Sequence, residues 1–487
     1  MFGSTDLLFS VRVRRLEMTD GRAVCARIVI GYIIPGRIFT AVWTPAAWSI
    51  GFITRIKEDY FMDSLIIEGG TRLKGSIRIN GSKNAALPIM AGALLANGPS
   101  VIYDVPDLSD ITHQNGLLVE LGAQVQRQKD GGLRIEVVNE SNSLARYDLV
   151  RKMRASICVL GPLLAKRKHA RVSMPGGCAI GDRPVDIHLR GLKALGATVE
   201  LDGGDIVIDA PRLRGAEIFL GGNFGSTVLG TDNVMCAAAL AEGTTVIESA
   251  ACEPEVVDLA DYLNTMGAKI TGQGTPRIVI EGVKELRGCE HRVIPDRIEA
   301  GTFMVAAAIC SGEVTLENVR LDHLLAAIDK LRGIGVSVEK DGGNCTVAAL
   351  GRMRATTITT QPHPGFPTDL QAQFMALLAL ADGNSIITEK IFPDRFLHVA
   401  ELSRMGARVH REGATVIVEG EQRLIGAPVM ASDLRASAAL VLAGMAARGT
   451  TTVNRVYHID RGYERIEERL NALGAKIRRV NQNDPDQ

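Results

Sequence analysis

The chain has 487 residues, in which 55 Lys and Arg balance 55 Asp and Glu. This length exceeds what one hydrophobic core usually organises, so we expect two domains. Without net charge the chain has no global field to hold a nucleic acid or an acidic membrane, so neither is an expected partner. Eight cysteines without CxxC spacing, several in apolar runs such as NVMCAAAL, indicate reduced core residues in a cytoplasmic protein without a zinc site.

Residues 1–61 differ in composition from the rest of the chain. They contain both tryptophans, the Arg-rich stretch RVRRLE, and apolar fragments such as IVIGYII that end at Pro35 and Arg37, too short to span a bilayer. No signal-peptide cleavage pattern is evident. We interpret Met62, which opens MDSLIIEGG, as the biological start and the preceding segment as translated upstream sequence. A genuine N-terminal appendage is the alternative.

From residue 62 onward a short glycine motif recurs six times. It reads LGAQV, LGATV, MGAKI, IGVSV, MGARV and LGAKI, with its glycine at Gly122, Gly196, Gly267, Gly335, Gly406 and Gly474. Each copy follows an amphipathic stretch and precedes a β-branched alternation, which predicts a helix closed by a C-terminal glycine and then a strand. Residues 62–487 number 426, or six units of 71, so the first 61 residues lie outside the repeat.

An Ala-rich segment precedes each of these glycines. Examples are TDNVMCAAALAEGTTVI and LRASAALVLAGMAARGTTTV. Because the segments are apolar nearly all round, each is predicted to be a buried helix that leads through a turn into a strand. Six βαβαβ-like units, three per domain, would enclose these helices within sheets. The predicted fold is therefore two inside-out α/β domains with buried helices.

Polar residues stand at the starts of these predicted helices. They are Lys83 and Asn84, Arg151 and Arg154, Asp296 and Arg297, Asp369, and Asp433 and Arg435. Helix N-termini present unpaired N–H groups that suit phosphate and carboxylate, so converging helices would line one polar cleft. An aspartate there can also serve only as a cap. A cation at a helix N-terminus is unfavourable with the helix dipole, so capping does not explain Lys83 and Arg154, and we expect them to have another role.

The motifs INGSKNAALP, DLVRKMRAS, PGGCAIGDRPVDIHL, PDRIEAGTF, GFPTDLQAQF and YHIDRGYERIEERL occur in this order. Together they resemble the UDP-N-acetylglucosamine 1-carboxyvinyltransferase family, the enolpyruvyl transferases of peptidoglycan synthesis, over about residues 62–480. The resemblance implies the enolpyruvyl transferase fold, with residues 62–83 and 295–487 in one domain and 84–294 in the other. It also implies a cytoplasmic enzyme that acts on small molecules, and we expect no cofactor or metal.

The resemblance further implies a reaction and its catalytic residues. The family transfers the enolpyruvyl group of phosphoenolpyruvate to the 3-hydroxyl of UDP-N-acetylglucosamine and releases phosphate. Cys178 matches the cysteine of a mobile loop that acts on phosphoenolpyruvate, and Asp369 matches a carboxylate near the sugar 3-hydroxyl, a plausible general base. From its neighbours alone, Cys178 reads as a small residue in a tight turn.

Binding residues follow from the same matches. The cations matched to phosphoenolpyruvate are Lys83, Arg183 and Arg461, with Arg435 and Arg395 in the same region. Asn84 matches a sugar contact, and Ile391 matches a backbone contact to the nucleotide sugar. The nucleotide-sugar site also matches Arg154, Arg183, Pro184, Val185, Asp186 and Ile187. The planar guanidinium group suits bidentate binding of carboxylate and phosphate.

Two departures from the family pattern leave alternatives open. A lysine that many members carry beside the diphosphate is missing near Gly225, where Ser226 and Thr227 could donate instead, and Cys158 stands where members often have tryptophan. One alternative is a catalytically silent paralogue that binds the nucleotide sugar. Another is 3-phosphoshikimate 1-carboxyvinyltransferase, which lacks the cysteine loop. The stretch GGNFGSTVLG is a weak phosphate-loop candidate because it lacks the Lys-Ser/Thr ending.

Overall fold

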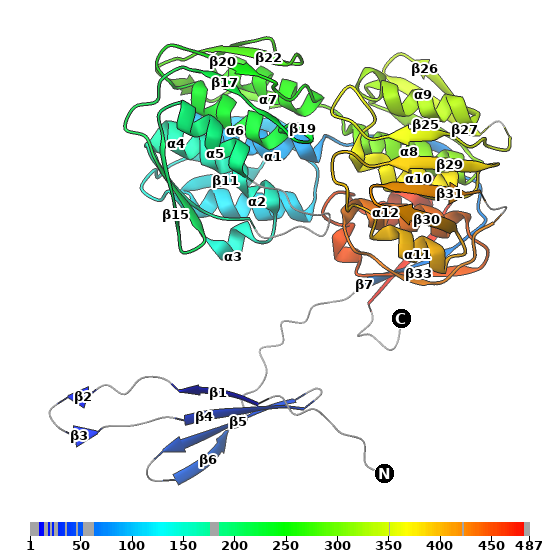
Figure 1. The fold of residues 1–487 in the computed structure, drawn as a ribbon, viewed down its shortest axis with the longest axis horizontal. Helices are drawn as coiled ribbons and strands as arrows, with labels where there is room; N and C mark the ends of the chain where they lie inside the picture. Colours follow the sequence, from blue (N-terminus) through cyan, green and yellow to red (C-terminus); the bar gives the residue numbers. More distant parts are fainter. Residues whose placement is uncertain are drawn as a thin grey trace. The chain divides into compact units, whose positions relative to one another are not determined.

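The computed structural model describes residues 63–175, 185–349, 351–420 and 423–481, together with the backbone of short strands before residue 52. The chain divides into two compact units, Met1–Phe61 and Met62–Gln487 (Figure 1). In the first unit, one sheet has the order β1 (Phe9–Val13), β4 (Ile28–Ile34), β5 (Arg37–Thr44) and β6 (Ala47–Gly51). A second pairs β2 (Met18–Thr19) with β3 (Arg22–Ala23).

The second unit is built from four-stranded sheets of one topology. Within its described residues, six such sheets each contain one parallel pair of strands followed by two antiparallel pairs. Three of them are β24 (Glu290–Arg292), β10 (Ser100–Tyr103), β12 (Leu133–Val137), β11 (Ala123–Arg127); β13 (Leu144–Ala145), β14 (His169–Ser173), β16 (Asp205–Asp209), β15 (Thr198–Asp202); and β17 (Glu217–Phe219), β20 (Thr244–Glu248), β22 (Arg277–Glu281), β21 (Lys269–Thr271).

The other three sheets include two that combine strands from both ends of this unit. They are β8 (Lys74–Arg78), β25 (Glu313–Glu317), β27 (Asn344–Ala349), β26 (Val336–Asp341); β28 (Thr357–Thr359), β29 (Asn384–Thr388), β31 (Thr415–Glu419), β30 (Arg408–Glu412); and β32 (Pro428–Met430), β33 (Thr450–Asn454), β7 (Asp63–Glu68), β34 (Lys476–Asn481). Smaller pairs are β9 (Ala96–Asn97) with β23 (Leu286–Arg287), and β18 (Gly221–Gly222) with β19 (Gly225–Ser226).

Each four-stranded sheet is associated with one buried and one surface helix. The buried helices are α1 (Lys83–Gly92), α4 (Leu160–Arg167), α6 (Val228–Ala238), α8 (Arg297–Ile309), α10 (Gln371–Leu378) and α12 (Leu434–Ala446). The surface helices are α2 (Ser109–Glu120), α5 (Asp186–Ala194), α7 (Pro254–Thr265), α9 (Leu325–Ile334), α11 (His398–Arg404) and α13 (Ile466–Ala472). Short helices are η1 (Ala93–Leu95), α3 (Tyr147–Val150), η2 (Arg154–Val159), η3 (Leu321–His323), η4 (Thr368–Leu370) and η5 (Val456–His458).

The Ala-rich helices lie inside the sheets, as the sequence predicts. Every residue of α10 is buried, and in α8 every residue after Arg297 is buried. Alanine side chains are small enough for α12 to lie against both α10 and α8. All six repeat glycines have positive φ, between 86° and 109°, and each is followed directly by a strand residue or by one residue and then a strand. The prediction of glycine-closed helices and of an inside-out α/β fold is confirmed.

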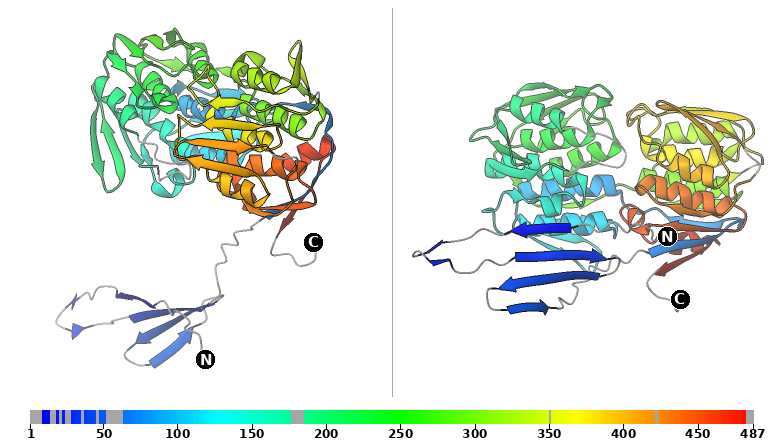
Figure 2. Two further views of the ribbon diagram at one scale, coloured as in Figure 1. Left: turned by 45° about the vertical axis from the view of Figure 1, so that its right-hand side comes forward. Right: turned by 60° about the horizontal axis from the view of Figure 1, so that its bottom comes forward.

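Met62–Gln487 contains two separate hydrophobic cores. One joins Leu65–Ile79 to residues 298–477, and we call this part the C lobe; the other runs from Ala85 to Val293 and forms the N lobe. Figures 1 and 2 show the two lobes side by side. The chain crosses between them twice, and the crossing segments pair, with Ser82 N donating to Ile294 O at 2.7 Å and Asp296 N to Asn80 O at 2.8 Å.

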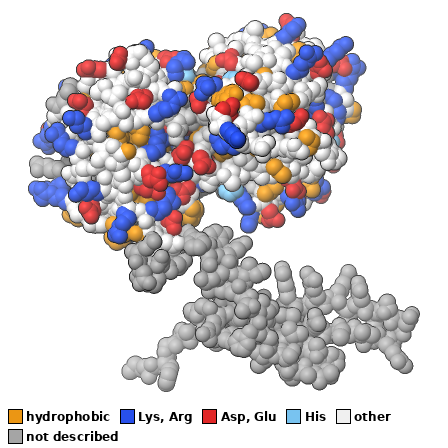
Figure 3. All heavy atoms as spheres, turned by 180° about the vertical axis from the view of Figure 1, so that it is seen from behind, with side chains coloured by type: hydrophobic (Ala, Val, Ile, Leu, Met, Phe, Trp, Pro, Cys, Tyr) orange, Lys and Arg blue, Asp and Glu red, His pale blue; other side chains and the backbone are white. Residues whose placement is uncertain are grey.

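The surface carries both signs of charge. On the face shown in Figure 3, acidic and basic side chains are interspersed rather than gathered into one large patch. In the ranges that the structure describes, no helix combines the length and apolar character needed to cross a membrane. Recognition of an anion by this protein therefore depends on local groups of cations, which the helix starts provide.

Candidate active site

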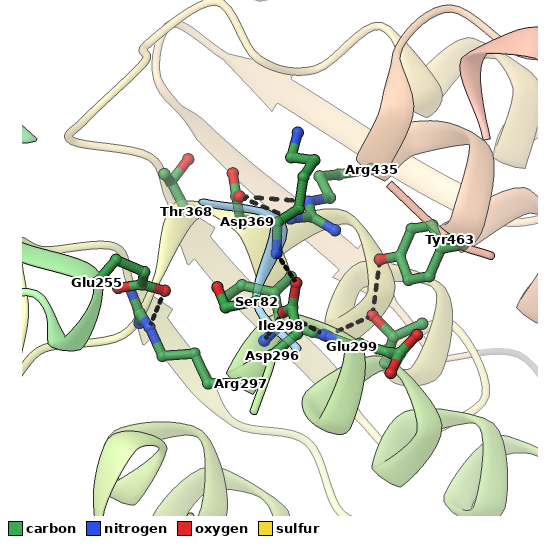
Figure 4. A network of polar contacts seen from close by, with 12 residues as sticks. Ser82, Glu255, Asp296, Arg297, Ile298, Glu299, Thr368, Asp369, Arg435 and Tyr463 are labelled. Atoms are coloured by element: carbon green, nitrogen blue, oxygen red, sulfur yellow. Dashed lines mark hydrogen bonds and ion pairs between the residues drawn. The ribbon is translucent and has the colours of Figure 1, made fainter. Parts of the chain in front are cut away.

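Three aspartates stand at the starts of the three buried helices of the C lobe, but they have different partners. Asp296 and Asp433 are caps: one carboxylate oxygen of each accepts the N–H groups of the second and third following residues, at 2.8 and 2.9 Å and at 2.9 and 3.1 Å respectively. Asp369 lies in η4, and α10 has no side-chain cap. Its carboxylate binds Arg395 and Arg435 instead, and Figure 4 shows the contact with Arg435. Capping therefore accounts for two of the aspartates and not for Asp369.

Asp369 is held from both sides by buried guanidinium groups. Its Oδ1 accepts from Arg395 Nη1 at 2.8 Å, and its Oδ2 accepts from Arg435 Nη2 at 3.1 Å and Nε at 3.2 Å. The Asp369 side chain is 26% exposed, while those of Arg395 and Arg435 are 7% and 2% exposed. Burial alone would raise the pKa of Asp369, but Arg435, Arg395 and Lys83 hold that pKa well below its usual range. Asp369 is thus an accessible, ionised carboxylate.

A second carboxylate, Asp110 in α2, holds two further cations. Its Oδ2 lies 3.2 Å from Lys83 Nζ and its Oδ1 lies 3.0 Å from Arg461 Nε. Burial alone would raise the pKa of Asp110, but Lys83 and Arg461 outweigh it and lower that pKa. Sequence matching missed Asp110. The sequence feature that could have pointed to Asp110 is its position as an acidic residue between the buried apolar Leu108 and Ile111.

Lys83 connects the two carboxylate groups. It is the first residue of α1, and its backbone N–H donates to Asp296 Oδ2 at 3.3 Å. Burial lowers the pKa of the Lys83 amine, and Arg435 and Arg461 lower it further, while Asp110 and Asp369 oppose this effect. The cations at this place outnumber the two carboxylates Asp110 and Asp369, so the site can accept an additional anion.

The site is formed by both lobes. Asp110 belongs to the N lobe and Arg461 to the C lobe. Nearby, Glu255 of α7 makes a two-pronged ion pair with Arg297 of α8, at 2.9 and 3.1 Å (Figure 4). Glu253 also accepts from His363 N at 3.3 Å. The relative position of the lobes therefore decides whether these charged groups meet.

The described residues offer no group of three or more His, Cys, Asp and Glu side chains that could hold a metal ion. Four of the sequence-matched cations, Lys83, Arg395, Arg435 and Arg461, lie in the network around Asp110 and Asp369. These cations can bind a phosphate or carboxylate substrate, and the partly exposed Asp369 carboxylate beside them can accept a proton from a hydroxyl.

A family model described as EPSP synthase (3-phosphoshikimate 1-carboxyvinyltransferase) matches residues 67–470. The chain belongs to this family. It is 56% identical over 419 residues to a UDP-N-acetylglucosamine 1-carboxyvinyltransferase of Methylacidiphilum infernorum, covering 86% of this chain and 99% of the relative. It is 54% identical over 426 residues to the protein of that name from Akkermansia muciniphila, covering 87% and 100%. These relatives confirm the resemblance seen in the motifs and make the chain an enolpyruvyl transferase enzyme.

Solved structures agree with this assignment. The enolpyruvyl transferase NikO from Streptomyces tendae superposes with a TM-score of 0.79 at 26% identity, covering 86% of this chain and 99% of that one. EPSP synthase from Acinetobacter baumannii shares the fold, with a TM-score of 0.68 at 20% identity over 86% of this chain and 100% of that one.

Most of the remaining matched positions of this enolpyruvyl transferase lie near helix starts or outside the described ranges. Asn84 and Arg154 are half-buried in the first turns of α1 and η2, whereas Arg151, expected at a helix start, ends α3 and is exposed. Val185 is buried, and Asp186 and Ile187 open α5. Outside the described residues lie Cys178, Arg183 and Pro184.

Ile391 follows a fully buried carboxylate. Its backbone N–H donates to Glu389 Oε1 at 2.8 Å, and the hydroxyl of Thr368, next to Asp369, donates to Glu389 Oε2 at 2.9 Å. Since the N–H of Ile391 is occupied, a backbone contact from this residue to a ligand would come from its carbonyl oxygen. Glu389 thus links the Ile391 turn to the residue before Asp369.

The structure leaves no room for an unstrained side chain at Gly225, near which the lysine is missing. Gly225 has φ +104°, and a Cβ built on it would lie 2.7 Å from Pro362 Cγ of the C lobe. A side chain at this position would need both a strained backbone and a shift of that contact. Thr227, one of the expected replacements, caps α6 by accepting from Gly230 N at 3.2 Å. The other departure, Cys158, is buried, and burial raises the pKa of its thiol.

Proposed function

We propose that this enzyme transfers the enolpyruvyl group of phosphoenolpyruvate to the 3-hydroxyl of UDP-N-acetylglucosamine and releases phosphate. This is the first committed step of peptidoglycan precursor synthesis, and we place it in the cytoplasm. The observation that carries the proposal is the partly exposed Asp369 carboxylate, held by two buried arginines beside Lys83 and Arg461, in a chain more than half identical to relatives of that name.

Phosphoenolpyruvate brings a carboxylate and a phosphate to the cations. Lys83 and Arg461 now share Asp110, and a substrate anion would compete with that carboxylate for them. Arg435 and Arg395 would likewise divide their donors between the substrate and Asp369. Arg183 is assigned to the same substrate from its motif.

The same competition for the cations would also set the pKa of Asp369, the proposed base. A carboxylate whose pKa is held far below its usual range is a poor proton acceptor, because catalysis is most efficient when the pKa of the base lies near the working pH. When a bound anion draws positive charge away from Asp369, its pKa rises and it can accept the proton of the sugar 3-hydroxyl. Substrate binding would thus activate the base.

The proposed reaction is an addition followed by an elimination. The sugar oxygen bonds to the second carbon of phosphoenolpyruvate and loses its proton to Asp369, while the methylene carbon gains a proton, for which Cys178 is the proposed donor. The resulting tetrahedral intermediate then loses a proton from its methyl group and expels phosphate, which restores the double bond. Asn84, Arg154, Arg183, Pro184, Val185, Asp186, Ile187 and Ile391 are proposed to hold the nucleotide sugar.

A phosphate-release assay tests the proposal. With both substrates the wild type should release phosphate, and with 3-phosphoshikimate in place of the nucleotide sugar it should not. Asp369→Asn keeps the size of the side chain but removes the base and one of its two acceptor oxygens, so turnover should fall ~10²–10⁴-fold with nucleotide-sugar affinity largely kept. Asp382→Asn is the matched control, since Asp382 forms an exposed ion pair with Arg352 in the same lobe.

The outcomes distinguish the alternatives. Release of phosphate with 3-phosphoshikimate would reassign the acceptor, and binding of the nucleotide sugar without any release would identify a silent paralogue. Equal losses of affinity and turnover in Asp369→Asn would make Asp369 a sugar-positioning group and contradict its role as the base.

A further inference from the structure

Arg435, which holds Asp369, is itself held on its other side by Tyr463. The Arg435 side chain is 2% exposed, and its Cζ lies 5.4 Å from the centre of the Tyr463 ring. Figure 4 shows Asp369 and Tyr463 on opposite sides of the guanidinium group. Nε and Nη2 of Arg435 donate to Asp369, and the guanidinium also has a side-chain hydrogen bond with Tyr463. The orientation of the guanidinium therefore depends on Asp369 and Tyr463.

The hydroxyl hydrogen of Tyr463 has a fixed direction. The Tyr463 oxygen lies 2.8 Å from Thr302 Oγ1, and Thr302 Oγ1 donates to the carbonyl oxygen of Ile298 at 2.8 Å. A threonine hydroxyl carries a single hydrogen, so Tyr463 must be the donor to Thr302. Burial raises the pKa of Tyr463, although Arg435 opposes it, so the phenol stays protonated at neutral pH. The lone pairs of the Tyr463 hydroxyl oxygen can then accept hydrogen bonds from donors on the side away from Thr302.

A glutamine connects this pair back to Asp369. Gln373 Nε2 lies 3.3 Å from the Tyr463 hydroxyl and 3.2 Å from Thr302 Oγ1, and it donates to the backbone carbonyl of Asp369 at 3.0 Å. Both the carboxylate and the backbone of Asp369 therefore belong to one buried network. Tyr463 is 1% exposed and Thr302 is 2% exposed, so neither can touch a substrate.

We propose that Tyr463, through its hydrogen bond to Thr302, is a positioning residue for the reaction: it orients the Arg435 guanidinium so that Asp369 Oδ2 is aimed for proton transfer. The inference rests on the proposed function. An ordinary core tyrosine contributes only to stability, whereas a positioning tyrosine acts on the chemical step, and these two roles are separable by experiment.

Tyr463→Phe removes the hydroxyl and keeps the ring over Arg435. We expect kcat to fall about tenfold, because a displaced Arg435 leaves Asp369 less well aligned for proton transfer, while KM for the nucleotide sugar stays within about twofold. Tyr262→Phe is the matched control, because Tyr262 is a fully buried tyrosine of the N lobe whose hydroxyl donates to Ser100 Oγ at 2.9 Å. It should lose comparable thermal stability and keep its kcat.

Thr302→Val removes the acceptor of the same hydrogen bond and should reproduce the kcat defect. The double variant should be no slower than the slower single variant, because both changes break one interaction. Additive losses, or a Tyr463→Phe kcat equal to that of Tyr262→Phe, would overturn the inference. So would an increase in KM without a change in kcat.

A measurement that does not depend on activity separates this inference from the proposed function. Crystal structures of wild type and Tyr463→Phe should show the Arg435 guanidinium displaced from Asp369 Oδ2 in the variant. Unchanged contacts of Nε and Nη2 with that oxygen would show that Tyr463 does not orient Arg435. A wild type without phosphate release would instead contradict the proposed function itself.

Discussion

His398, the first residue of α11, shows how one buried residue of this network couples to pH. It is 1% exposed and lies near the caps and arginines of the site. Burial lowers the pKa of His398 from 6.5 to about 4; Asp433 opposes this shift and Arg395 adds to it. The folded protein therefore holds the imidazole neutral where the unfolded chain would protonate it.

The consequence is a loss of stability in acid. Below pH 6.5 His398 is protonated in the unfolded chain but stays neutral in the folded protein. The free energy of unfolding should therefore decrease as the pH falls from about 6.5 to about 4. His398→Gln should flatten this part of the curve. Denaturant unfolding at several pH values measures it, with His410→Gln on the exposed face of β30 as the control.

Parallel curves for wild type and His398→Gln would show that the pKa of His398 is the same in the folded and unfolded states. A steeper curve for the variant would reverse the sign of the argument.

At the residue scale, the sequence motifs identified the cationic residues of the site but not all of the carboxylates and hydroxyls that bind them. Lys83 and Arg461 follow from local motifs, because each motif is continuous in the chain. Asp110 does not: it acquires its role only when α2 of the N lobe meets a residue of the C lobe far along the chain. The Tyr463–Thr302 contact likewise joins residues from α8 and the last repeat. Such pairs depend on tertiary structure, which local patterns do not encode.

At the element scale, the glycine that ends α9 is required for its backbone conformation and not for lack of space. Gly335 closes α9 with φ +102° and ψ 20°, and a Cβ built there meets no other atom within 4 Å. Gly333, two residues earlier within the same helix, also has open space around a Cβ. The two positions differ in backbone conformation alone, which makes them a matched pair.

The same substitution should therefore have opposite effects at these two sites. Gly333→Ala should stabilise the protein by about 0.5–1 kcal/mol, because alanine favours the helical conformation. Gly335→Ala should destabilise it by about 1–2 kcal/mol, because alanine is strained at positive φ. Denaturant unfolding of both variants measures the difference. Equal signs would show that packing, not φ, determines the choice of glycine in this helix.

At the scale of the whole molecule, the sixfold period predicted six similar βαβαβ-like units but not which strands pair in each sheet. The sixth sheet places β7, from the start of the unit, between β33 and β34 from its end. The fourth sheet pairs β8 with β25 across the whole N lobe. A repeat period fixes the order of elements within a unit, whereas pairing between the ends of the chain is decided by the packing of the C lobe.

Residues 1–61 contribute to none of these sheets. Each of the six four-stranded sheets takes all its strands from residues after 62, and among residues whose burial is described the cores begin at Leu65. Deleting residues 1–61 should therefore leave the melting temperature and the rate of phosphate release nearly unchanged. Deleting residues 1–69 is the control: it also removes β7, a central strand with partners on both sides, and should prevent folding. A fall of several degrees in the shorter deletion would mean that the segment packs on the enzyme, and the interpretation of Met62 as the start would then be wrong.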